Sequence, residues 1–280
     1  MIPSQLAILI HWITEREAIR QFKEAGAPRP WTDDPILATW RFCNVNRCDD
    51  RETKWIFKHV IEAHSTSPAL WFNLAVARFI NWSPTLEKLG YFHGWNRDRF
   101  VEVISGIQGK AYTGAYMIPA GPSGVVKHDF LADYVFAPLW DLRSERPTEQ
   151  SCASWDVFFR RVRCMGAFLR NQIITDMKYS HHLENAVDWS SFVLAGPGTM
   201  RGLNRLAGFP LTRKPDSLTA QVELLKLREV LLATNSTWEP LFDDLNNLSN
   251  CMCEYDKYCR VRNGEGKPRS RYVPYAGEES

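Results

Sequence analysis

The 280 residues include 45% hydrophobic and 12% aromatic side chains, enough apolar surface for the core of one large domain or two small ones. The 34 Lys and Arg residues against 32 Asp and Glu residues leave a net charge of +2, which excludes a basic field over the whole surface and restricts any anion site to a local cluster. Seven cysteines with no C-x-x-C pair and no secretory signal predict reduced thiols in a cytoplasmic protein.

Apolar residues recur at intervals of three and four along most of the chain. This pattern predicts packed helices over 6–26, 49–64 and 69–81, and a longer, central helix within 155–179. Strand patterns are scarce, and the glycine-rich, aromatic segment 111–126 predicts a loop or a short hairpin. The apolar stretch 4–13 is too short to span a bilayer, so we expect no membrane segment.

The organisation expected from these patterns is a mainly α, multi-helical globular domain over residues 1–262. The connector-like composition of 143–154 suggests possible sub-lobes at 1–142 and 155–262. Residues 263–280 combine glycine, proline and charge, which predicts a basic, loosely ordered tail.

Two sequence stretches are dense in polar groups, and the first, 40–56, lies between aromatic residues. Asn44, Arg47 and Asp50 are spaced three apart, so one helical face can present an amide, a guanidinium and a carboxylate. Such a set can read a base edge or orient a reacting amine. A ladder of ion pairs that fixes a loop is an equally good interpretation. In the second stretch Asp176 falls on an apolar helix, where a carboxylate must be paired or functional.

The glycine-rich stretch 193–209, VLAGPGTMRGLNRLAGF, predicts a tight turn at 196–198 that leads into a helix. Glycines allow positive φ angles and a close backbone approach, and the free amides of the helix can bind an anion. Arg201 and Arg205 are one turn apart and can add charge-assisted contacts to a phosphate. The alternative is a connecting turn with two solvated arginines. The turn is similar to the hairpin of helix-hairpin-helix DNA-binding modules.

Near the C-terminus, arginines and lysines alternate with tyrosines over 255–272, a composition typical of a nucleic-acid contact and equally of a solvated tail. Cys251, Cys253 and Cys259 have no fourth ligand at a usual spacing, so we expect no metal.

Seven motifs in chain order carry a family resemblance: PWTDDPIL, RFCNVNRCDDR, LWFNLAVARFIN, GAYMI, FLRNQIITDMKY, VLAGPGTMRGLNRL and CEYDKYCRVRNGEGKPR. As an ordered set over about residues 10–272, they resemble the helical domain of the phage thymine-hypermodification proteins. That family, once called α-glutamyl/putrescinyl thymine pyrophosphorylases, includes amino acid:DNA transferases and the helical domain attached to 5-hydroxymethyluracil DNA kinases.

The resemblance implies work on 5-hydroxymethyluracil in the DNA of a phage, in the cytoplasm of the infected host. A kinase phosphorylates the hydroxymethyl group, and a transferase then replaces the phosphate with an amino acid or polyamine nitrogen. This sequence has no Walker loop, so we expect no ATP hydrolysis and no cofactor. The expected partners are double-stranded DNA carrying modified thymine, an amine donor and a separate upstream kinase.

Candidate roles follow from this chemistry. The base is Asp50 or Asp176, and Asn44 with Arg47 reads the uracil edge or holds an amino acid carboxylate. The candidate DNA and phosphate contacts are Gly196, Gly198, Arg201, Gly202, Asn204, Arg205, Lys257, Tyr258 and Arg260. The candidate substrate contacts are Arg41, Arg51, Arg78, Asn81, Tyr116 and Gln172.

Two other functions stay open. The chain can be a non-catalytic DNA-binding helical module that partners a kinase. It can also be a glycosylase of the helix-hairpin-helix type, with a DNA glycosylase-like helical fold and Asp216 as its carboxylate. However, the segment RKPDSLTAQ around Asp216 is typical of a helix N-cap.

Overall fold

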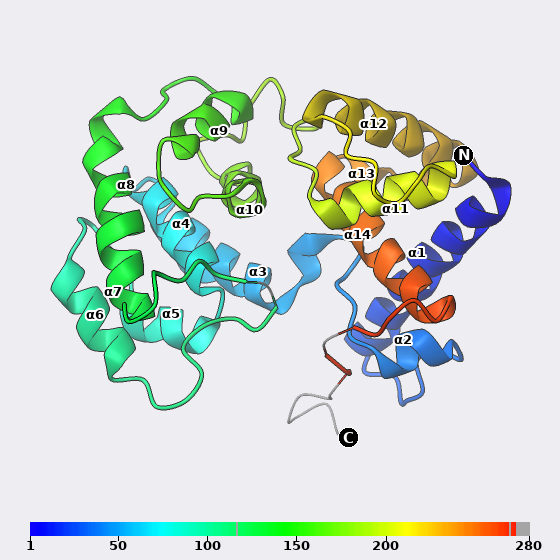
Figure 1. The fold of residues 1–280 in the computed structure, drawn as a ribbon, viewed down its shortest axis with the longest axis horizontal. Helices are drawn as coiled ribbons and strands as arrows, with labels where there is room; N and C mark the ends of the chain where they lie inside the picture. Colours follow the sequence, from blue (N-terminus) through cyan, green and yellow to red (C-terminus); the bar gives the residue numbers. More distant parts are fainter. Residues whose placement is uncertain (116, 269, 273–280) are drawn as a thin grey trace. The chain divides into compact units, whose positions relative to one another are not determined.

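The computed structural model describes residues 1–115, 117–268 and 270–272, and within these ranges it is helical with no β-strand (Figure 1). Trp40 and Arg271 form an isolated antiparallel β-bridge outside any strand. The predicted all-helical class is therefore confirmed. The described part of 111–126 is irregular and forms no hairpin strand.

The chain folds as two compact units, each with its own core. Unit 1 combines Met1–Asp50 with the chain from Val193 onward, and unit 2 is Arg51–Phe192. This division differs from the contiguous sub-lobes 1–142 and 155–262 expected from the sequence. Its physical reason is packing of the first helix on the last helices: the Ile2 amide donates to the Leu206 carbonyl, and the Tyr255 hydroxyl donates to Gln5.

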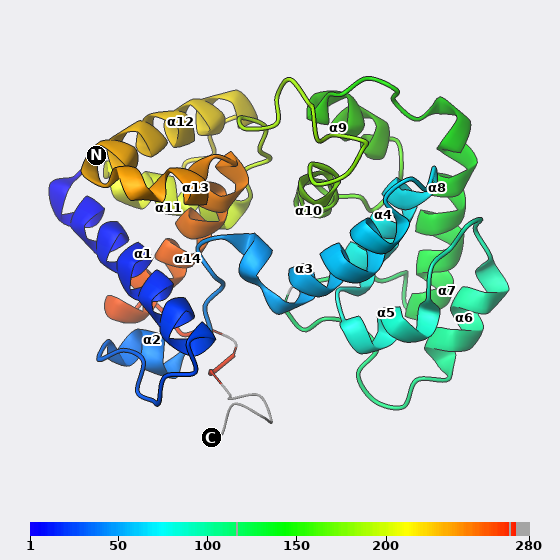
Figure 2. The ribbon, with the colours of Figure 1, turned by 180° about the vertical axis from the view of Figure 1, so that it is seen from behind.

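The described residues of unit 1 form six α-helices: α1 (Pro3–Glu24), α2 (Pro35–Thr39), α11 (Pro197–Ala207), α12 (Ser217–Thr234), α13 (Glu239–Phe242) and α14 (Leu245–Arg262) (Figure 2). The carboxylates of Asp34, Asp216 and Asp244 cap the starts of α2, α12 and α14 by accepting amide hydrogen bonds. Asp216 is thus an N-cap, as its sequence context predicts. The core contains Trp12 of α1 and Tyr255 of α14, both fully buried.

Unit 2 contains α3 (Arg51–Ile56), α4 (Leu70–Ile80), α5 (Ser83–Leu89), α6 (Arg97–Ser105), α7 (Lys127–Leu131), α8 (Ala137–Asp141), α9 (Cys152–Arg160) and α10 (Ala167–Met177). Short π turns continue α3 over Phe57–Ile61 and join α7 to α8 over Ala132–Phe136. Every residue of α4 is buried, so this helix is the centre of the unit. Its residues Trp71 and Phe72 pack among further aromatic rings.

The periodic run 155–179 is not one helix. It divides into α9 and α10 at 161–166, where Cys164 has a φ of +68°, in the left-handed region. Apolar spacing continues across this break, so the hydrophobic pattern alone could not show it. The described end of the predicted tail also differs from a free chain, because the Tyr272 amide donates to the Thr39 carbonyl.

No described helix combines the length and apolar character needed to cross a membrane.

Candidate functional site

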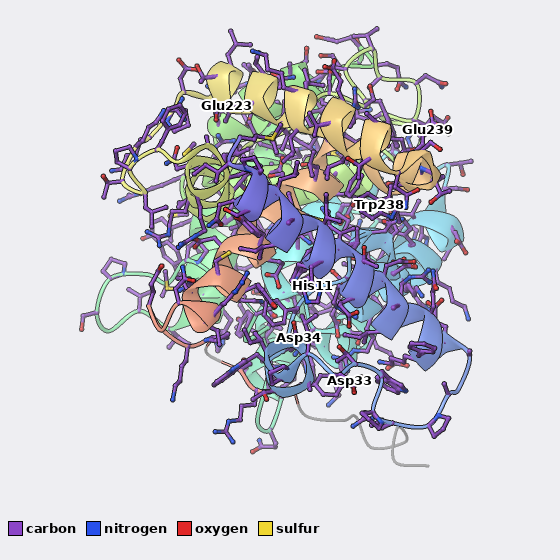
Figure 3. All side chains as sticks on the ribbon, turned by 90° about the vertical axis from the view of Figure 1, so that its right-hand side faces the viewer. His11, Asp33, Asp34, Glu223, Trp238 and Glu239 are labelled. Atoms are coloured by element: carbon purple, nitrogen blue, oxygen red, sulfur yellow. The ribbon has the colours of Figure 1, made fainter. Side chains whose placement is uncertain are left out.

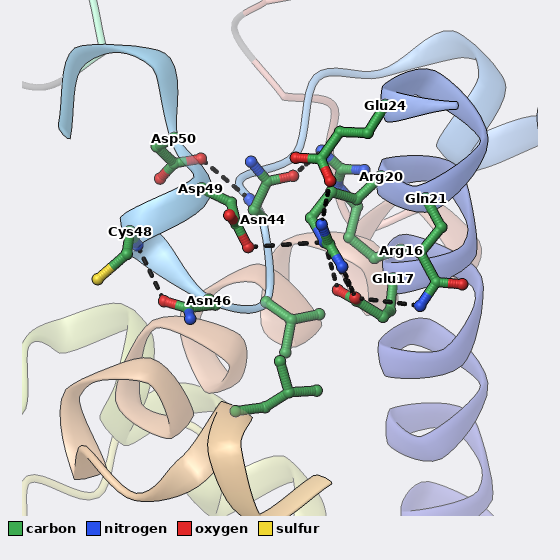
Figure 4. Close-up of polar contacts among 12 residues, drawn as sticks. Arg16, Glu17, Arg20, Gln21, Glu24, Asn44, Asn46, Cys48, Asp49 and Asp50 are labelled. Atoms are coloured by element: carbon green, nitrogen blue, oxygen red, sulfur yellow. Dashed lines mark hydrogen bonds and ion pairs between the residues drawn. The ribbon is translucent and has the colours of Figure 1, made fainter. Parts of the chain in front are cut away.

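The loop 41–50 of unit 1 lies against α1 and α14 (Figure 4). Residues 41–46 are not helical, and Arg47–Asp49 forms a single 3-10 turn that Asn46 caps by accepting from the Cys48 amide at 2.9 Å. The helical face predicted for Asn44, Arg47 and Asp50 is therefore wrong. An Asx-type turn competes with helix here, because the Asn46 side chain satisfies the local backbone.

Helix α14 fixes the loop through side chains that accept its backbone amides. The Cys43 amide donates to Glu254 Oε2 at 3.0 Å, and the Arg47 amide donates to Asn247 Oδ1 at 3.1 Å. These bonds satisfy polar groups that burial would otherwise leave unpaired. The Arg47 side chain is buried, with 6% of the residue exposed.

Helix α1 contributes Arg16 to the same loop. Its Nε donates to the Cys43 carbonyl at 3.0 Å and its Nη2 donates to Asn44 Oδ1 at 2.6 Å. The remaining nitrogen, Nη1, is buried and has no hydrogen-bond acceptor among the described residues. One turn further along α1, Arg20 forms ion pairs with Glu17, Glu24 and Asp49 (Figure 4). The loop is thus bordered by guanidinium groups.

Asp50 completes this arrangement, because its Oδ1 accepts the Asn44 amide at 3.1 Å. Burial raises the pKa of this carboxyl, while the Asn44 amide and the nearby charges of Arg47 and Arg16 oppose the rise. As a residue Asp50 is half-buried, and its carboxyl binds a proton more readily than an ordinary aspartate. That combination suits a general base.

The thiols beside the loop are poor nucleophiles. Burial raises the pKa of the Cys43 thiol well above its ordinary value. Burial likewise raises the pKa of Cys251. These cysteines stay protonated near neutral pH. Among the described residues, no group of His, Cys, Asp and Glu side chains could hold a metal ion.

In unit 2, Asp176 of α10 lies against Arg78 of α4. Both carboxylate oxygens accept from this guanidinium, at 2.5 Å from Nε and 2.7 Å from Nη2. Arg78 also donates to Asn81 Oδ1 and Thr53 Oγ1, each at 3.0 Å. The pair is almost fully buried, with 4% of the Arg78 side chain and 1% of the Asp176 side chain exposed. The structure thus brings together three predicted site residues, and Asp176 is paired.

The other candidate substrate contacts are dispersed. Arg51 is exposed on α3, where it pairs with Glu52 and lies over the Trp82 ring. Arg41 is exposed beside Ser270, whose carbonyl accepts its amide. Gln172 is half-buried on α10. Tyr116 lies outside the described residues.

The glycines of α11 contact α14 closely. A Cβ on Gly198 would lie 2.3 Å from Cys253 Sγ, and a Cβ on Gly202 would lie 2.2 Å from the Met252 carbonyl oxygen. The predicted helix is present, but it begins at Pro197, so Pro197 and Gly198 belong to α11 rather than to a turn, and neither Gly196 nor Gly198 has a positive φ. No described residue between α10 and Gly196 is helical, so the predicted helix-hairpin-helix arrangement is absent here. Gly198 and Gly202 instead permit helix packing.

Replacing Gly202 by alanine should lower the free energy of unfolding by about 1–3 kcal/mol, because the added methyl would overlap a backbone carbonyl that cannot move aside. Gly196→Ala is the matched control, since its Cβ would meet nothing within 4 Å. Thermal melting of both variants measures the effect. Equal melting temperatures would contradict the close contact of α11 and α14.

The predicted phosphate-binding side chains have partners within unit 1. Arg201 and Arg205 of α11 both bind Asp256, at 3.1 and 3.0 Å, and Arg205 also binds Glu265 at 2.7 Å. Arg260 lies 3.4 Å from Asp256. Three arginines therefore share two carboxylates, and Arg201 and Arg260 each keep 37% of their side chains exposed.

Other residues predicted to bind DNA also have hydrogen-bond or ion-pair partners within unit 1. Lys257 pairs with Glu254 at 2.5 Å, and the buried Asn204 donates to the Arg213 carbonyl at 2.9 Å. The Tyr258 hydroxyl donates to Asp34 Oδ2 at 2.6 Å. The tyrosine hydroxyl thus supports α2 from within the unit.

Glu265 provides a test of this ion-pair network. Hydrogen bonds from Arg205 lower the pKa of Glu265 from 4.5 to about 2. Because the folded pKa is depressed, the stabilisation is present above about pH 4.5 and is lost as the pH falls through about 2. The side chain is 35% exposed, so solvent screening limits the effect to about 0.5 kcal/mol. Denaturation of Glu265→Gln should show this loss at neutral pH and none near pH 2. An equal loss of stability at both pH values would contradict a stabilising role of the ionised Glu265.

A cavity of about 450 Å³ lies on the other side of α1 from its core-facing residues, lined by His11, Glu15, Ala18, Phe22, Trp31, Thr32, Asp33 and Asp34. Figure 3 shows His11 beside Asp34 and Asp33. Its polar groups bind one another: His11 contacts Asp34 at 2.9 Å, and Thr32 donates to Glu15 at 2.6 Å. None of the predicted site residues lines it.

Comparison with known proteins identifies the family of the chain. The family model described as "5-hmdU DNA kinase, helical domain" matches residues 4–268. The chain belongs to that helical-domain family. Among curated proteins it is similar to the "5-hmdU DNA kinase" of Bacillus phage SP10, with 23% identity over 214 residues. This match covers 64% of the chain and 32% of the relative, so the chain spans about a third of the relative's length. No solved structure matches the chain.

The family match agrees with the resemblance carried by the ordered sequence motifs. Sequence reasoning found Asn44, Arg47 and Asp50 but missed Arg16 and Glu254, which complete the loop. No local pattern marks those two residues. Arg16 is 28 residues from Asn44 and Glu254 is 211 residues from Cys43.

Proposed function

We propose that the chain is an amino acid:DNA transferase that acts on phosphorylated 5-hydroxymethyluracil in phage DNA. It replaces the phosphate on the 5-methylene carbon with the nitrogen of an amino acid or polyamine. The observation that carries this proposal is the half-buried Asp50, whose pKa is raised by burial beside Arg16 and Arg47. The 280 residues contain no Walker loop, so the proposal concerns the transfer step rather than the phosphorylation step.

The reaction needs a base and an anion-binding group near the exposed nucleotide. The amine nitrogen forms a bond to the methylene carbon, and the carbon–oxygen bond breaks as phosphate departs with the electron pair. The proton released from the nitrogen passes to the Asp50 carboxylate. Extrusion of the base from the duplex costs a few kcal/mol, which contacts to the DNA backbone offset.

Arg16 supplies the anion-binding group in this proposal. Its unpartnered Nη1 lies in the same loop network as Asp50, linked through Asn44. A guanidinium nitrogen without an acceptor suits the carboxylate of an amino acid or the leaving phosphate. Asn44 is a positioning residue in this arrangement, because it bridges Arg16 and Asp50. We assign Asp176 a structural role, since Arg78 occupies both of its oxygens.

The test is incubation of the protein with duplex DNA containing 5-phosphomethyluracil and a pool of amino acids and putrescine. Mass spectrometry of the digested nucleosides should show a new adduct and free phosphate should appear. Abasic sites would instead support a glycosylase. DNA that is bound but chemically unchanged would contradict the transferase proposal.

The second candidate is a non-catalytic DNA-binding module that works beside a 5-hydroxymethyluracil DNA kinase. It is favoured by the match to the phage SP10 kinase, of which this chain corresponds to about a third. A module of this kind would bind duplex DNA and raise the yield of a separately added kinase. In that case the modified DNA would carry phosphate and no amine.

A further inference from the structure

Exposed arginines of unit 2 lie in the turn between α9 and α10 and in the segment before α9; Figure 1 shows the two helices. From residue 141 to residue 170 the chain has six arginines and four carboxylates. We define the arginine patch as five of these residues: Arg143, Arg146, Arg160, Arg161 and Arg163. All are exposed except Arg146, which is half-buried.

Contacts within unit 2 join three of these residues, Arg143, Arg146 and Arg161. Arg161 Nη2 lies 2.7 Å from Glu145 Oε2, which joins the end of α9 to the segment 143–146. Arg146 Nη1 donates to the Arg143 carbonyl at 2.8 Å. Arg160 ends α9 directly before Arg161, and Arg163 follows two residues later in the same turn.

The patch has more cationic than anionic groups. Glu145 pairs with Arg161, and Asp156 is shared between Arg160 and Arg170. Arg143 and Arg146 donate to carbonyl groups, which leaves their charges uncompensated. Arg163 is exposed and has no ion pair among the described residues. It is followed by Cys164 at a φ of +68°, where the chain turns sharply between the two helices.

The arginine patch differs from the arginines of α11 and α14. Arg201, Arg205 and Arg260 surround the buried Asp256, and Arg205 is only 8% exposed. Arg160 and Arg161 keep 58% and 43% of their side chains exposed. The patch therefore offers more accessible guanidinium groups to a polyanion than α11 does.

We propose that the arginine patch binds the phosphate backbone of duplex DNA. Guanidinium groups match the geometry of phosphate oxygens, and such contacts position a protein on DNA without reading its sequence. The identity of the polyanion as DNA rests on the proposed function. The phosphates that contact the patch belong to the DNA backbone rather than to the leaving group.

Arg163→Ala tests the patch, with Arg97→Ala as the matched control. Arg97 is an exposed arginine of the same unit, but Asp129 and Asp133 neutralise it. Binding to unmodified duplex DNA is measured by fluorescence anisotropy at several salt concentrations. Arg163→Ala should weaken binding about threefold to tenfold and reduce the salt slope by about 1, and a double change with Arg143→Ala should reduce it by about 2. Thermal melting checks that each variant is folded.

The outcomes separate this inference from the transferase proposal. Wild-type affinity and salt slope in both patch variants would overturn the inference, as would a wild-type protein that does not bind duplex DNA. If the patch variants lose binding while the wild-type protein forms no adduct with 5-phosphomethyluracil DNA, the inference stands and the transferase proposal fails. An effect of Arg97→Ala equal to that of Arg163→Ala would also overturn the inference. Loss of any exposed arginine would then weaken DNA binding, whether or not it belongs to the patch.

Discussion

Asp176→Asn should lower the free energy of unfolding by about 3–5 kcal/mol, because it leaves the buried Arg78 charge without its counter-ion. The melting temperature of unit 2 should fall by roughly 10 °C. Only 4% of the Arg78 side chain is exposed, so water cannot replace the lost carboxylate. Thermal unfolding followed by circular dichroism measures this loss.

Asp133→Asn is the matched control for this change. Asp133 also accepts two bonds from one guanidinium, at 2.6 and 2.9 Å from Arg97, but its side chain is 40% exposed. Exposed ion pairs contribute about 0–1 kcal/mol, so this variant should melt close to the wild-type temperature. Similar small losses in both variants would show that burial does not determine the strength of the Arg78–Asp176 pair.

Asp50→Asn should lower the rate of amine transfer by about 10²–10⁴-fold, the range typical of a lost general base. The fold should persist, because the asparagine oxygen can still accept the Asn44 amide. The rate of adduct formation is measured by mass spectrometry at saturating DNA. Asp49→Asn is the control, since Asp49 belongs to the same turn and pairs with Arg20.

The pH dependence gives a second readout for Asp50. A base acts in its deprotonated form, so the wild-type rate should fall as the pH decreases through the raised pKa of Asp50. This acidic limb should be absent from the residual rate of Asp50→Asn. A variant with the wild-type rate and the wild-type pH profile would remove Asp50 from the mechanism.

Helical periodicity predicted the fold class because most of the chain buries one face of each helix. It also identified α11 and the Asp216 cap, since both depend on residues close in sequence. The argument that a carboxylate on an apolar helix must be paired or functional led to the contact between Asp176 and Arg78. These features follow from local chemistry.

Features that depend on distant partners could not be predicted in this way. Loop 41–50 is held in place by α14, whose Asn247 accepts the Arg47 amide across 200 residues. The role of Gly202 is visible only when Met252 is placed against it. Similarly, the spacing of Arg201 and Arg205 is compatible with a bound phosphate or with a carboxylate of the protein. Only the position of Asp256 in the fold shows that both arginines pair with a carboxylate.

The discontinuous composition of unit 1 has a consequence for synthesis. Helix α1 emerges from the ribosome long before α11 and α14, the helices that cover its apolar residues Leu9, Trp12 and Ile13. Unit 2 is continuous and complete once Phe192 has emerged. Domains fold as units during translation, so unit 2 can close while α1 still exposes apolar surface to chaperones and to other nascent chains.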